Sequence, residues 1–416
     1  MKKYVFFASC IKDMGGAQMY LRNKCLYLQE QGWDVSLVSA QKGRVYISEL
    51  KKYDLFIPEL GFDYYLFSKK RRERIVNEII GKFIQKQYED IVIESTCISE
   101  CTWGEVVAER IGARHLCYIL QEYNTTSSVT EQDFLCFKYD RHELAGIVQK
   151  SLQNLFASFY PIEAEKSYFL PAYCNNVVED IDSDDLKNIN RQDYDYVVGC
   201  LSRLDKPFII HALSDFINYA QSHSEKKYLL LMIGGAPEGS TFEKNIRKQF
   251  ENVKNVTLYI TGYLFPVPSQ LLDACDAFFT SAGSTWVCMR SGVPTISYDG
   301  NDFRPIGILG RTTNSSLMRA DNEPEQELSS LIDEILEEKV YTKEKQTHEQ
   351  NKPDFTDHDK FLSEMAKKKE YFSFDNVSMN NAEKKLSLLL RIVGAENYYS
   401  LGAWKKKMLN KTTSDR

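Results

Sequence analysis

The segment 273–300 carries the residue types best suited to holding an anionic group. It reads DACDAFFTSAGSTWVCMRSGVPTISYDG, in which an apolar strand at 277–279 is followed by Gly283, Ser284 and Thr285 before a helix. Small residues at such a junction let the backbone approach a ligand, and the helix presents unpaired N–H groups and its positive dipole end. We therefore expect a phosphate at this turn, although an ordinary strand-to-helix turn has a similar composition.

Other apolar strands also end in charged or small residues. The strand at 196–203 leads into a loop with Arg203, Asp205 and Lys206. The strands at 228–235 and 256–262 end in glycine, and near the N-terminus a strand at 3–8 precedes Gly15 and Gly16, which open a helix. Strands that alternate with helices form parallel sheets, which bind ligands at the carboxyl ends of their strands. The sequence therefore predicts an α/β protein.

Bulk composition limits the class of protein. A chain of 416 residues with 43% hydrophobic content suits about two domains. The net charge of −6 argues against a nucleic-acid partner. The ten cysteines are scattered without a Cys/His cluster of zinc spacing, which favours a reduced cytosolic compartment and a protein that is soluble or peripheral to a membrane at most. The histidines show no partner pattern and are interpreted as structural or surface residues.

The polar segment 179–195, EDIDSDDLKNINRQDYD, is interpreted as an interdomain linker. We expect a first Rossmann-like domain at 1–178, a second at 196–370, and a C-terminal helical segment at 371–416 that crosses back to the first. In that segment we expect a helix at 376–393, with Leu386, Leu389 and Leu390 on one face. We also expect an acidic helix at 323–338 and an exposed loop or frayed helix at 342–359.

The ordered set of motifs resembles glycosyltransferase family 4. It consists of GGA followed by a helix and GWDVSLV, then VVGCLSRLDK, LLLMIGGAPEG, TLYITGY, DAFFTSAGS and SGVPTIS. The resemblance covers most of residues 1–310 and implies the GT-B fold, in which two doubly wound Rossmann-like domains face each other across a cleft. It further implies a nucleotide-sugar donor, retention of anomeric configuration, and no metal or other cofactor.

The resemblance assigns roles to the strand-end residues. Arg203 matches the arginine that stabilises the leaving diphosphate, and Lys206 lies closer to it than the family lysine does, where this chain has Phe208. The remaining donor-site candidates are Gly15, Gly16, Gly262, Tyr263, Gly283, Ser284 and Thr285. Alternatively, the glycine pair makes a tight turn that needs positive φ, and Tyr263 packs rather than stacking on a base.

One departure from the family concerns acidic residues. Family members carry two glutamates in the interval between Asp276 and Asp299, where this chain has none. Asp299 and Asp302 are the nearest possible substitutes, although Asp and Gly after a strand usually form a turn. The departure leaves open the donor and the activity itself.

In the expected first domain, two strands at 91–95 and 115–122 end in polar residues. Glu94, Gln121 and Glu122 occupy places where the family has His or acidic groups near the sugar and acceptor. We interpret Glu94 and Glu122 as catalytic together with Arg203, and Gln121 and Arg141 as acceptor-side residues. Arg141, His142 and Glu143 are expected on a helix. Each of these residues has the alternative of a hydrogen-bonded strand end.

Two basic stretches remain. The run 69–74, KKRRER, is interpreted as a solvated helix start. The tail 398–411 mixes Tyr398, Tyr399 and Trp404 with lysines, which suits an anionic membrane surface or, equally, a packed terminal helix.

These features favour a transferase that moves a sugar from a nucleotide-sugar to a growing glycan in bacterial surface-polysaccharide synthesis. We expect a lipid-linked glycan as the acceptor, and a location in the cytoplasm, at the inner face of the plasma membrane if the protein is peripheral. The alternatives are a non-catalytic GT-B subunit that supports a partner transferase, and a nucleotide-sugar epimerase of the same fold.

Overall fold

A computed structural model describes residues 1–121, 125–160, 162, 168–174, 176–187, 189–344, 353–366 and 369–400. By its internal contacts the chain divides into two compact units. The first comprises Met1–Lys12, Leu21–Tyr173 and Pro353–Arg416, and the second comprises Asp13–Tyr20 and Cys174–Lys352. The expected linker at 179–195 thus belongs to the second unit, and the return to the first begins at Pro353 rather than at 371. Leu186, Ile189 and Tyr194 explain the difference, because they pack against the core of the second unit.

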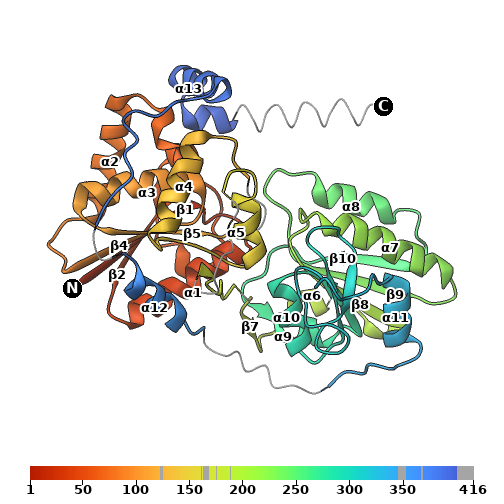
Figure 1. The fold of residues 1–416 in the computed structure, drawn as a ribbon. Coiled ribbons are helices and arrows are strands. Elements are labelled where there is room, and N and C mark those ends of the chain that lie inside the picture. The colour runs from red at the N-terminus through yellow and green to blue at the C-terminus, as the bar shows by residue number, and fades with distance from the viewer. Residues whose placement is uncertain are drawn as a thin grey trace. The chain divides into compact units, whose positions relative to one another are not determined.

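The first unit is built on a six-stranded, fully parallel sheet (Figure 1). Its strands, in spatial order, are β3 (Leu55–Phe56), β2 (Asp34–Gln41), β1 (Lys2–Cys10), β4 (Asp90–Ser95), β5 (Arg114–Ile119) and β6 (Leu144–Gly146). The order reverses between β1 and β4. Neighbouring residues of β1 are buried on opposite faces, and Val5 and Phe7 belong to one continuous core. Burial on two faces explains why the strand reads as a continuous apolar run.

Helices cover both faces of this sheet, with α1 and α12 on one side and α2, α3 and α4 on the other (Figure 1). The helices are α1 (Gly16–Glu30), α2 (Lys69–Phe83), α3 (Ile98–Ile111), α4 (Val129–Asp140), α5 (Gln149–Phe156), α12 (Thr356–Glu364) and α13 (Asn381–Val393). Helix α1 begins in the second unit and ends in the first. The basic run at 69–74 starts α2, as predicted: Lys69 and Lys70 are exposed, whereas the Arg72 guanidinium lies 4.6 Å from the centre of the Tyr64 ring.

A buried ionic network ties α3 and α4 to β5 and β6. Lys138 Nζ donates to Glu105 Oε2 at 2.9 Å and to Glu143 Oε2 at 2.6 Å, and His115 Nδ1 lies 2.7 Å from Glu105 Oε2. Burial by itself raises the pKa of Glu105, but the Lys138 charge and the His115 contact outweigh it and hold that pKa at about 2. Glu105 is therefore a buried carboxylate that is ionised and fully paired.

The second unit has its own six-stranded sheet. In spatial order its strands are β10 (Val256–Ile260), β9 (Tyr228–Ile233), β8 (Tyr196–Leu201), β12 (Ala277–Thr280), β13 (Thr295–Tyr298) and β14 (Pro305–Ile308). All pair in parallel except β14, which runs antiparallel to β13. A small parallel pair, β7 (Val178–Glu179) and β11 (Val267–Pro268), lies outside this sheet.

Both faces of the second sheet are also buried. Along β8, Val198 and Cys200 enter one core, whereas Val197 and Leu201 enter another. The helices are α6 (Asp184–Lys187), α7 (Phe208–Ser222), α8 (Phe242–Phe250), α9 (Ser269–Asp273), α10 (Gly283–Arg290) and α11 (Leu328–Leu336). The α/β prediction of doubly wound units is confirmed.

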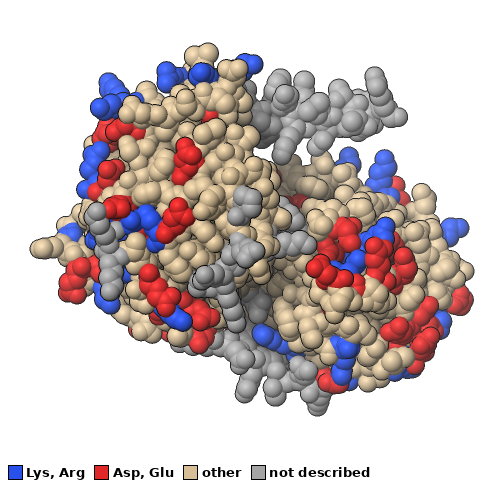
Figure 2. All heavy atoms as spheres, viewed as in Figure 1, with Lys and Arg blue, Asp and Glu red and all other residues tan. Residues whose placement is uncertain are grey.

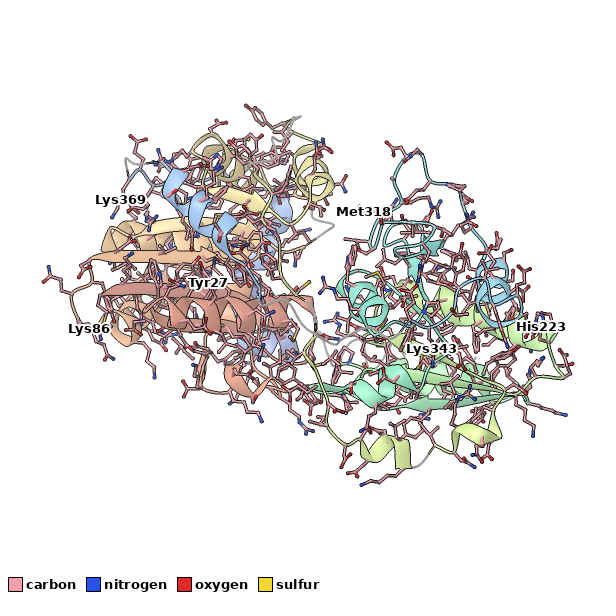
Figure 3. All side chains as sticks on the ribbon, turned by 90° about the horizontal axis from the view of Figure 1, so that it is seen from below. Tyr27, Lys86, His223, Met318, Lys343 and Lys369 are labelled. Carbon is pink, nitrogen blue, oxygen red and sulfur yellow. The ribbon has the colours of Figure 1, made fainter. Side chains whose placement is uncertain are left out.

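The C-terminal segment packs on the first unit. Tyr27 of α1, labelled in Figure 3, donates its hydroxyl to Asp359 of α12, and Arg114 Nη1 donates to Leu362 O at 2.7 Å. Helix α12 thus occupies part of the segment that was expected to be a loop or frayed helix. Helix α13 begins after a capping box at Asn380 and Glu383. All three predicted leucines lie in α13, but only part of their face is buried, because Leu390 is 1% exposed and Leu389 is 40% exposed.

Figure 2 shows basic and acidic side chains intermingled on the visible surfaces of both units. In the second unit, Arg247 pairs with Glu243 one helical turn away, and Arg311 pairs with Glu344. Lys343, labelled in Figure 3, donates to Asp273 O at 2.9 Å. Much of the surface charge is therefore compensated locally.

Candidate functional site

The strand order of the second unit defines one preferred place for a ligand. From β8 the chain proceeds outward to β9 and β10, and then returns to β12 on the other side of β8. In open α/β sheets, ligands bind beyond the carboxyl ends of the strands at this point of reversal. Thr280 Oγ1 donates to Leu201 O at 2.7 Å and holds the carboxyl ends of β12 and β8 together. The loop with Arg203 and the turn with Gly283 therefore leave the sheet side by side.

Arg203 is held in position by Asp205, two residues further along the same loop. Its Nε lies 3.0 Å from Asp205 Oδ1, and its Nη2 donates to Asp205 Oδ2 at 3.1 Å. The guanidinium remains 31% exposed. Asp205 contacts only the Nε and Nη2 side of the guanidinium, so other N–H groups of Arg203 remain for a second anion. Arginine binds phosphate in this planar, two-pronged geometry. Lys206 is exposed, and its backbone amide closes the loop by donating to Arg203 O at 3.4 Å.

Gly15 lies beside Arg203 within the second unit. A Cβ on Gly15 would come within 3.3 Å of Arg203 Nη1 and 3.2 Å of Gln18 Oε1. Neither Gly15 nor Gly16 has positive φ, so the alternative that this pair makes a tight turn with positive φ is wrong. In this loop it is Asp13 that adopts φ 60°. Close approach accounts for Gly15. Gly16 starts α1, as predicted.

The start of α10 is strained. Ala282, immediately before the helix, has φ 59° and ψ −137°. Residues other than glycine seldom adopt this backbone conformation. Its N–H donates to Ser316 O at 2.6 Å. Gly283 and Ser284 are half-buried, whereas Thr285 is buried and its Oγ1 has no hydrogen-bond partner among the described residues. A strained turn with an unsatisfied hydroxyl at a helix N-terminus suits a polar ligand.

Glycines at the ends of β9 and β10 bring backbones together. Gly234 has φ 152°, and a Cβ there would lie 1.9 Å from Ser202 O, so only glycine fits. Gly262, with φ 78°, bridges to Gly234. The Tyr263 ring packs against Gly235, whose added Cβ would meet that ring at 2.8 Å. Tyr263 thus packs beside the strand end.

Asp299 and Asp302 hold the loop after β13. Asp299 Oδ1 accepts from the amides of Asn301 and Asp302, and its Oδ2 accepts from the amide of Arg319 at 2.6 Å. Asp302 accepts from the Arg304 amide and pairs with Arg319 at 3.3 Å. These contacts favour the turn interpretation over a replacement for the missing glutamates.

The acceptor-side candidates lie in the first unit. Glu94 is fully buried in β4 and accepts a 2.5 Å hydrogen bond from Tyr4. Burial and the Glu94 charge raise the pKa of Tyr4, so this phenol stays a donor. Gln121 is exposed after β5, and Glu122 lies outside the described residues.

Arg141 pairs with Glu143 and Glu370, each at 3.0 Å. The predicted helix across 141–143 is wrong, because α4 ends at Asp140 and His142 has φ 55°. Two carboxylate partners at the end of α4 are consistent with a structural role for Arg141.

Sequence reasoning missed three features of these units. Ala282 gives no sign of strain in the sequence, and the close approach of Gly234 to Ser202 depends on the register of neighbouring strands. The sequence has no Cys/His cluster of zinc spacing, yet folding brings Cys101, His115 and Cys117 together. Their separation along the chain matches no short metal motif, so only the packing of α3 on β5 shows the cluster.

Solved structures share this architecture. Anabaena HepE, crystallised with UDP and glucose, superposes with a TM-score of 0.54 at 15% identity, covering 82% of this chain and 91% of that one. The same protein with UDP-glucose gives 0.55 at 14% identity over the same shares of the chains. A glycosyltransferase from Rickettsia africae gives 0.53 at 13% identity, covering 80% and 87%. The chain has the GT-B fold.

No protein-family model and no curated protein matches the sequence. Within the described part of the chain, no helix combines the length and apolarity needed to cross a membrane.

Proposed function

We propose that this protein is a retaining glycosyltransferase of the family 4 type, which transfers a sugar from a nucleotide-sugar to a glycan. One observation carries the proposal: Arg203 and the strained N-terminus of α10 follow neighbouring strands at the point where the strand order reverses. When the bond between sugar and diphosphate breaks, negative charge develops on the leaving phosphate. A fixed guanidinium and helix N–H groups stabilise that charge without reorganising.

In this proposal each residue near the strand ends has one task. Arg203 binds the diphosphate, and Asp205 orients Arg203. The amides of Gly283 and Ser284 and the hydroxyl of Thr285 bind the second phosphate, with Lys206 as an outer cation. The Thr285 amide itself donates to Ala282 O at 3.1 Å. Gly15 and Gly16 leave room for the donor, while Gly262 and Tyr263 lie on the nucleobase side. With these cations, we expect no divalent ion to be required.

The finer assignments follow from the family resemblance and from the solved relatives of this fold. HepE was crystallised with UDP and with UDP-glucose, so a uridine nucleotide is the first donor to test. We propose a growing, lipid-linked surface polysaccharide as the acceptor, with Glu94 and Glu122 on the catalytic side and Gln121 and Arg141 toward the acceptor. A lipid-linked acceptor places the protein at the inner face of the plasma membrane.

A non-catalytic subunit is the second candidate function. It is favoured by the absence of acidic residues between Asp276 and Asp299 and by the structural contacts of Asp299 and Asp302. A subunit that has lost its donor site would bind no nucleotide. An epimerase would bind the nucleotide-sugar and convert it without an acceptor, so product analysis separates it from a transferase.

The test is calorimetric titration with UDP, GDP, ADP and CMP, with Arg203→Ala as the variant. Loss of the charged contact should weaken binding of the preferred nucleotide by about 2 kcal/mol, which is roughly 30-fold in Kd. Arg247→Ala, which removes an exposed arginine on α8, should bind as the wild type does. Equal affinity in Arg203→Ala would reject the role of Arg203.

The variant Gly283→Glu provides a second test of the diphosphate site. A carboxylate at the helix N-terminus would repel the diphosphate, so the nucleotide that raises the melting temperature of the wild type should leave this variant unchanged. Gly81→Glu is the matched control, because a Cβ on Gly81 meets open space in α2. If the folded wild type ignores every nucleotide, the non-catalytic interpretation replaces the transferase.

A further inference from the structure

Three buried side chains with metal-binding atoms converge in the first unit. Cys101 lies on α3, and His115 and Cys117 lie two residues apart on β5, where their side chains share one face. One potential ligand atom from each residue lies within 4.8 Å of the other two. Cys101 and Cys117 have no exposed surface, and the His115 side chain is likewise 0% exposed. Helices α3 and α4 cover this part of the sheet (Figure 1).

The spacing of the donor atoms suits a small tetrahedral ion. Zinc binds sulfur at about 2.3 Å and imidazole nitrogen at about 2.0 Å, so ligands on adjacent corners stand roughly 3.5–4 Å apart. Cys117 Sγ lies 3.9 Å from His115 Nε2. All three atoms lie within 4.8 Å of one another, so side-chain movements of up to about 1 Å bring them to tetrahedral spacing.

The surroundings of His115 fix the tautomer that a metal requires. Glu105 Oε2 lies 2.7 Å from Nδ1 and also accepts a hydrogen bond from Lys138, so it serves as the acceptor for an Nδ1–H donor. Nε2 therefore keeps its lone pair and points toward the Ser95 hydroxyl, 2.9 Å away. Metal-binding histidines commonly donate their other N–H to such a carboxylate. Lys138 and the Phe372 amide hold Glu105 in place, at 2.9 and 2.8 Å.

We propose that Cys101, His115 and Cys117 bind a structural zinc ion, with the Ser95 hydroxyl on the fourth side. Two thiolates and an imidazole select zinc over hard cations. Binding converts two thiols to thiolates and releases their protons to solvent, while the charge of the ion is balanced by the thiolates. Complete burial makes the site closed, so the ion would tie α3 to β5 rather than act on a substrate.

Because the cluster is buried, zinc should enter as the chain folds. The test is to unfold the full chain, remove metal with a chelator, and refold it under reducing conditions with or without zinc. Elemental analysis of the refolded, desalted protein should find about one zinc per chain, and the zinc-free protein should melt at a lower temperature. Cys117→Ser and Cys101→Ser should lose the zinc. Cys136→Ser, a half-buried cysteine of α4, should retain it.

Cobalt gives a measurement on the wild type alone, in case the cysteine variants do not fold. Refolding with cobalt should produce the near-ultraviolet charge-transfer absorption of thiolate-bound cobalt. A wild type that takes up neither metal would overturn the proposal. So would zinc retained in Cys117→Ser, or a Cys101–Cys117 disulfide in the protein isolated from cells.

Discussion

Two lysines of the first unit are buried in very different surroundings. Lys138 has two carboxylate partners, whereas Lys24 Nζ has no hydrogen-bond partner among the described residues. The Lys24 ammonium instead lies 4.6 Å from the centre of the Phe355 ring. Burial lowers the pKa of Lys24 to about 8, although the charges of Glu94 and Asp359 partly oppose the shift. The buried charge of Lys24 therefore lowers the free energy of unfolding, whereas Lys138 has its charge balanced by Glu105 and Glu143.

We expect Lys24→Met to stabilise the protein at pH 7. The pKa of Lys24 rises from about 8 in the folded chain to 10.5 in the unfolded chain, so below pH 8 the wild type buries a full charge. The gain should be about 1–3 kcal/mol at pH 7. Between pH 8 and 10.5 the folded state sheds its proton first, so the gain should shrink as pH rises.

Urea unfolding at pH 7 and pH 10 measures this difference. Lys138→Met is the matched control, which should destabilise the protein because Glu105 and Glu143 lose their shared cation. Equal stability of Lys24→Met and wild type at pH 7 would contradict the interpretation of Lys24.

Single residues were the least predictable level of this protein. Arg203 follows a recognisable strand, so its place in the loop after β8 was predicted from the sequence. The groups around Lys24, Glu94 and His115 come from other segments of the chain, and the sequence does not show which residues folding will bring together. Strain at Ala282 likewise depends on the path of the backbone between β12 and α10.

Elements were predicted well where burial leaves a continuous pattern. The parallel strands β1, β8, β9 and β12 have continuous apolar centres because both of their faces are covered. Short or polar elements were missed. The antiparallel strand β14 has only four residues. Helix α12 reads TDHDKFLSE, in which most residues are polar and only His358, Phe361 and Leu362 are buried. Their positions depend on the partners onto which they fold.

Helix α13 has exposed apolar residues, and a tail rich in aromatic residues and lysines follows it. Leu388 and Ile392 are 60% and 72% exposed, whereas Tyr398 and Tyr399 pack on Phe62 with ring centroids 5.3 and 5.1 Å away. The two tyrosines of the tail thus belong to the first unit. The rest of the tail, at 401–411, lies outside the described residues and supplies four lysines and Trp404.

If this tail binds anionic lipid, Lys405→Glu/Lys406→Glu should reduce co-sedimentation with anionic vesicles at low salt. Each lysine near such a surface contributes about 1 kcal/mol, so reversing two should lower the partition coefficient by at least 30-fold. Lys69→Glu/Lys70→Glu changes the same charge at the exposed start of α2 and should bind as the wild type does. Equal losses in the two variants would point to net charge rather than to the tail.

At the scale of the whole molecule, each unit has its own sheet and its own core. The proposed diphosphate site lies in the second unit, and the proposed zinc site lies in the first. The two sites share no residue and belong to different units. Failure of one proposal would therefore leave the other intact.

This separation can be measured as a double-mutant cycle with Arg203→Ala and Cys117→Ser. Changes at sites without shared partners add to within about 0.3–0.5 kcal/mol. Cys117→Ser should lower the stability of the first unit and leave nucleotide affinity unchanged, and Arg203→Ala should weaken nucleotide binding without altering zinc content. The double variant should therefore have the stability of Cys117→Ser and the nucleotide affinity of Arg203→Ala. A coupling above about 1 kcal/mol in the nucleotide-binding free energy would mean that the metal cluster and the diphosphate site report on a common conformational equilibrium.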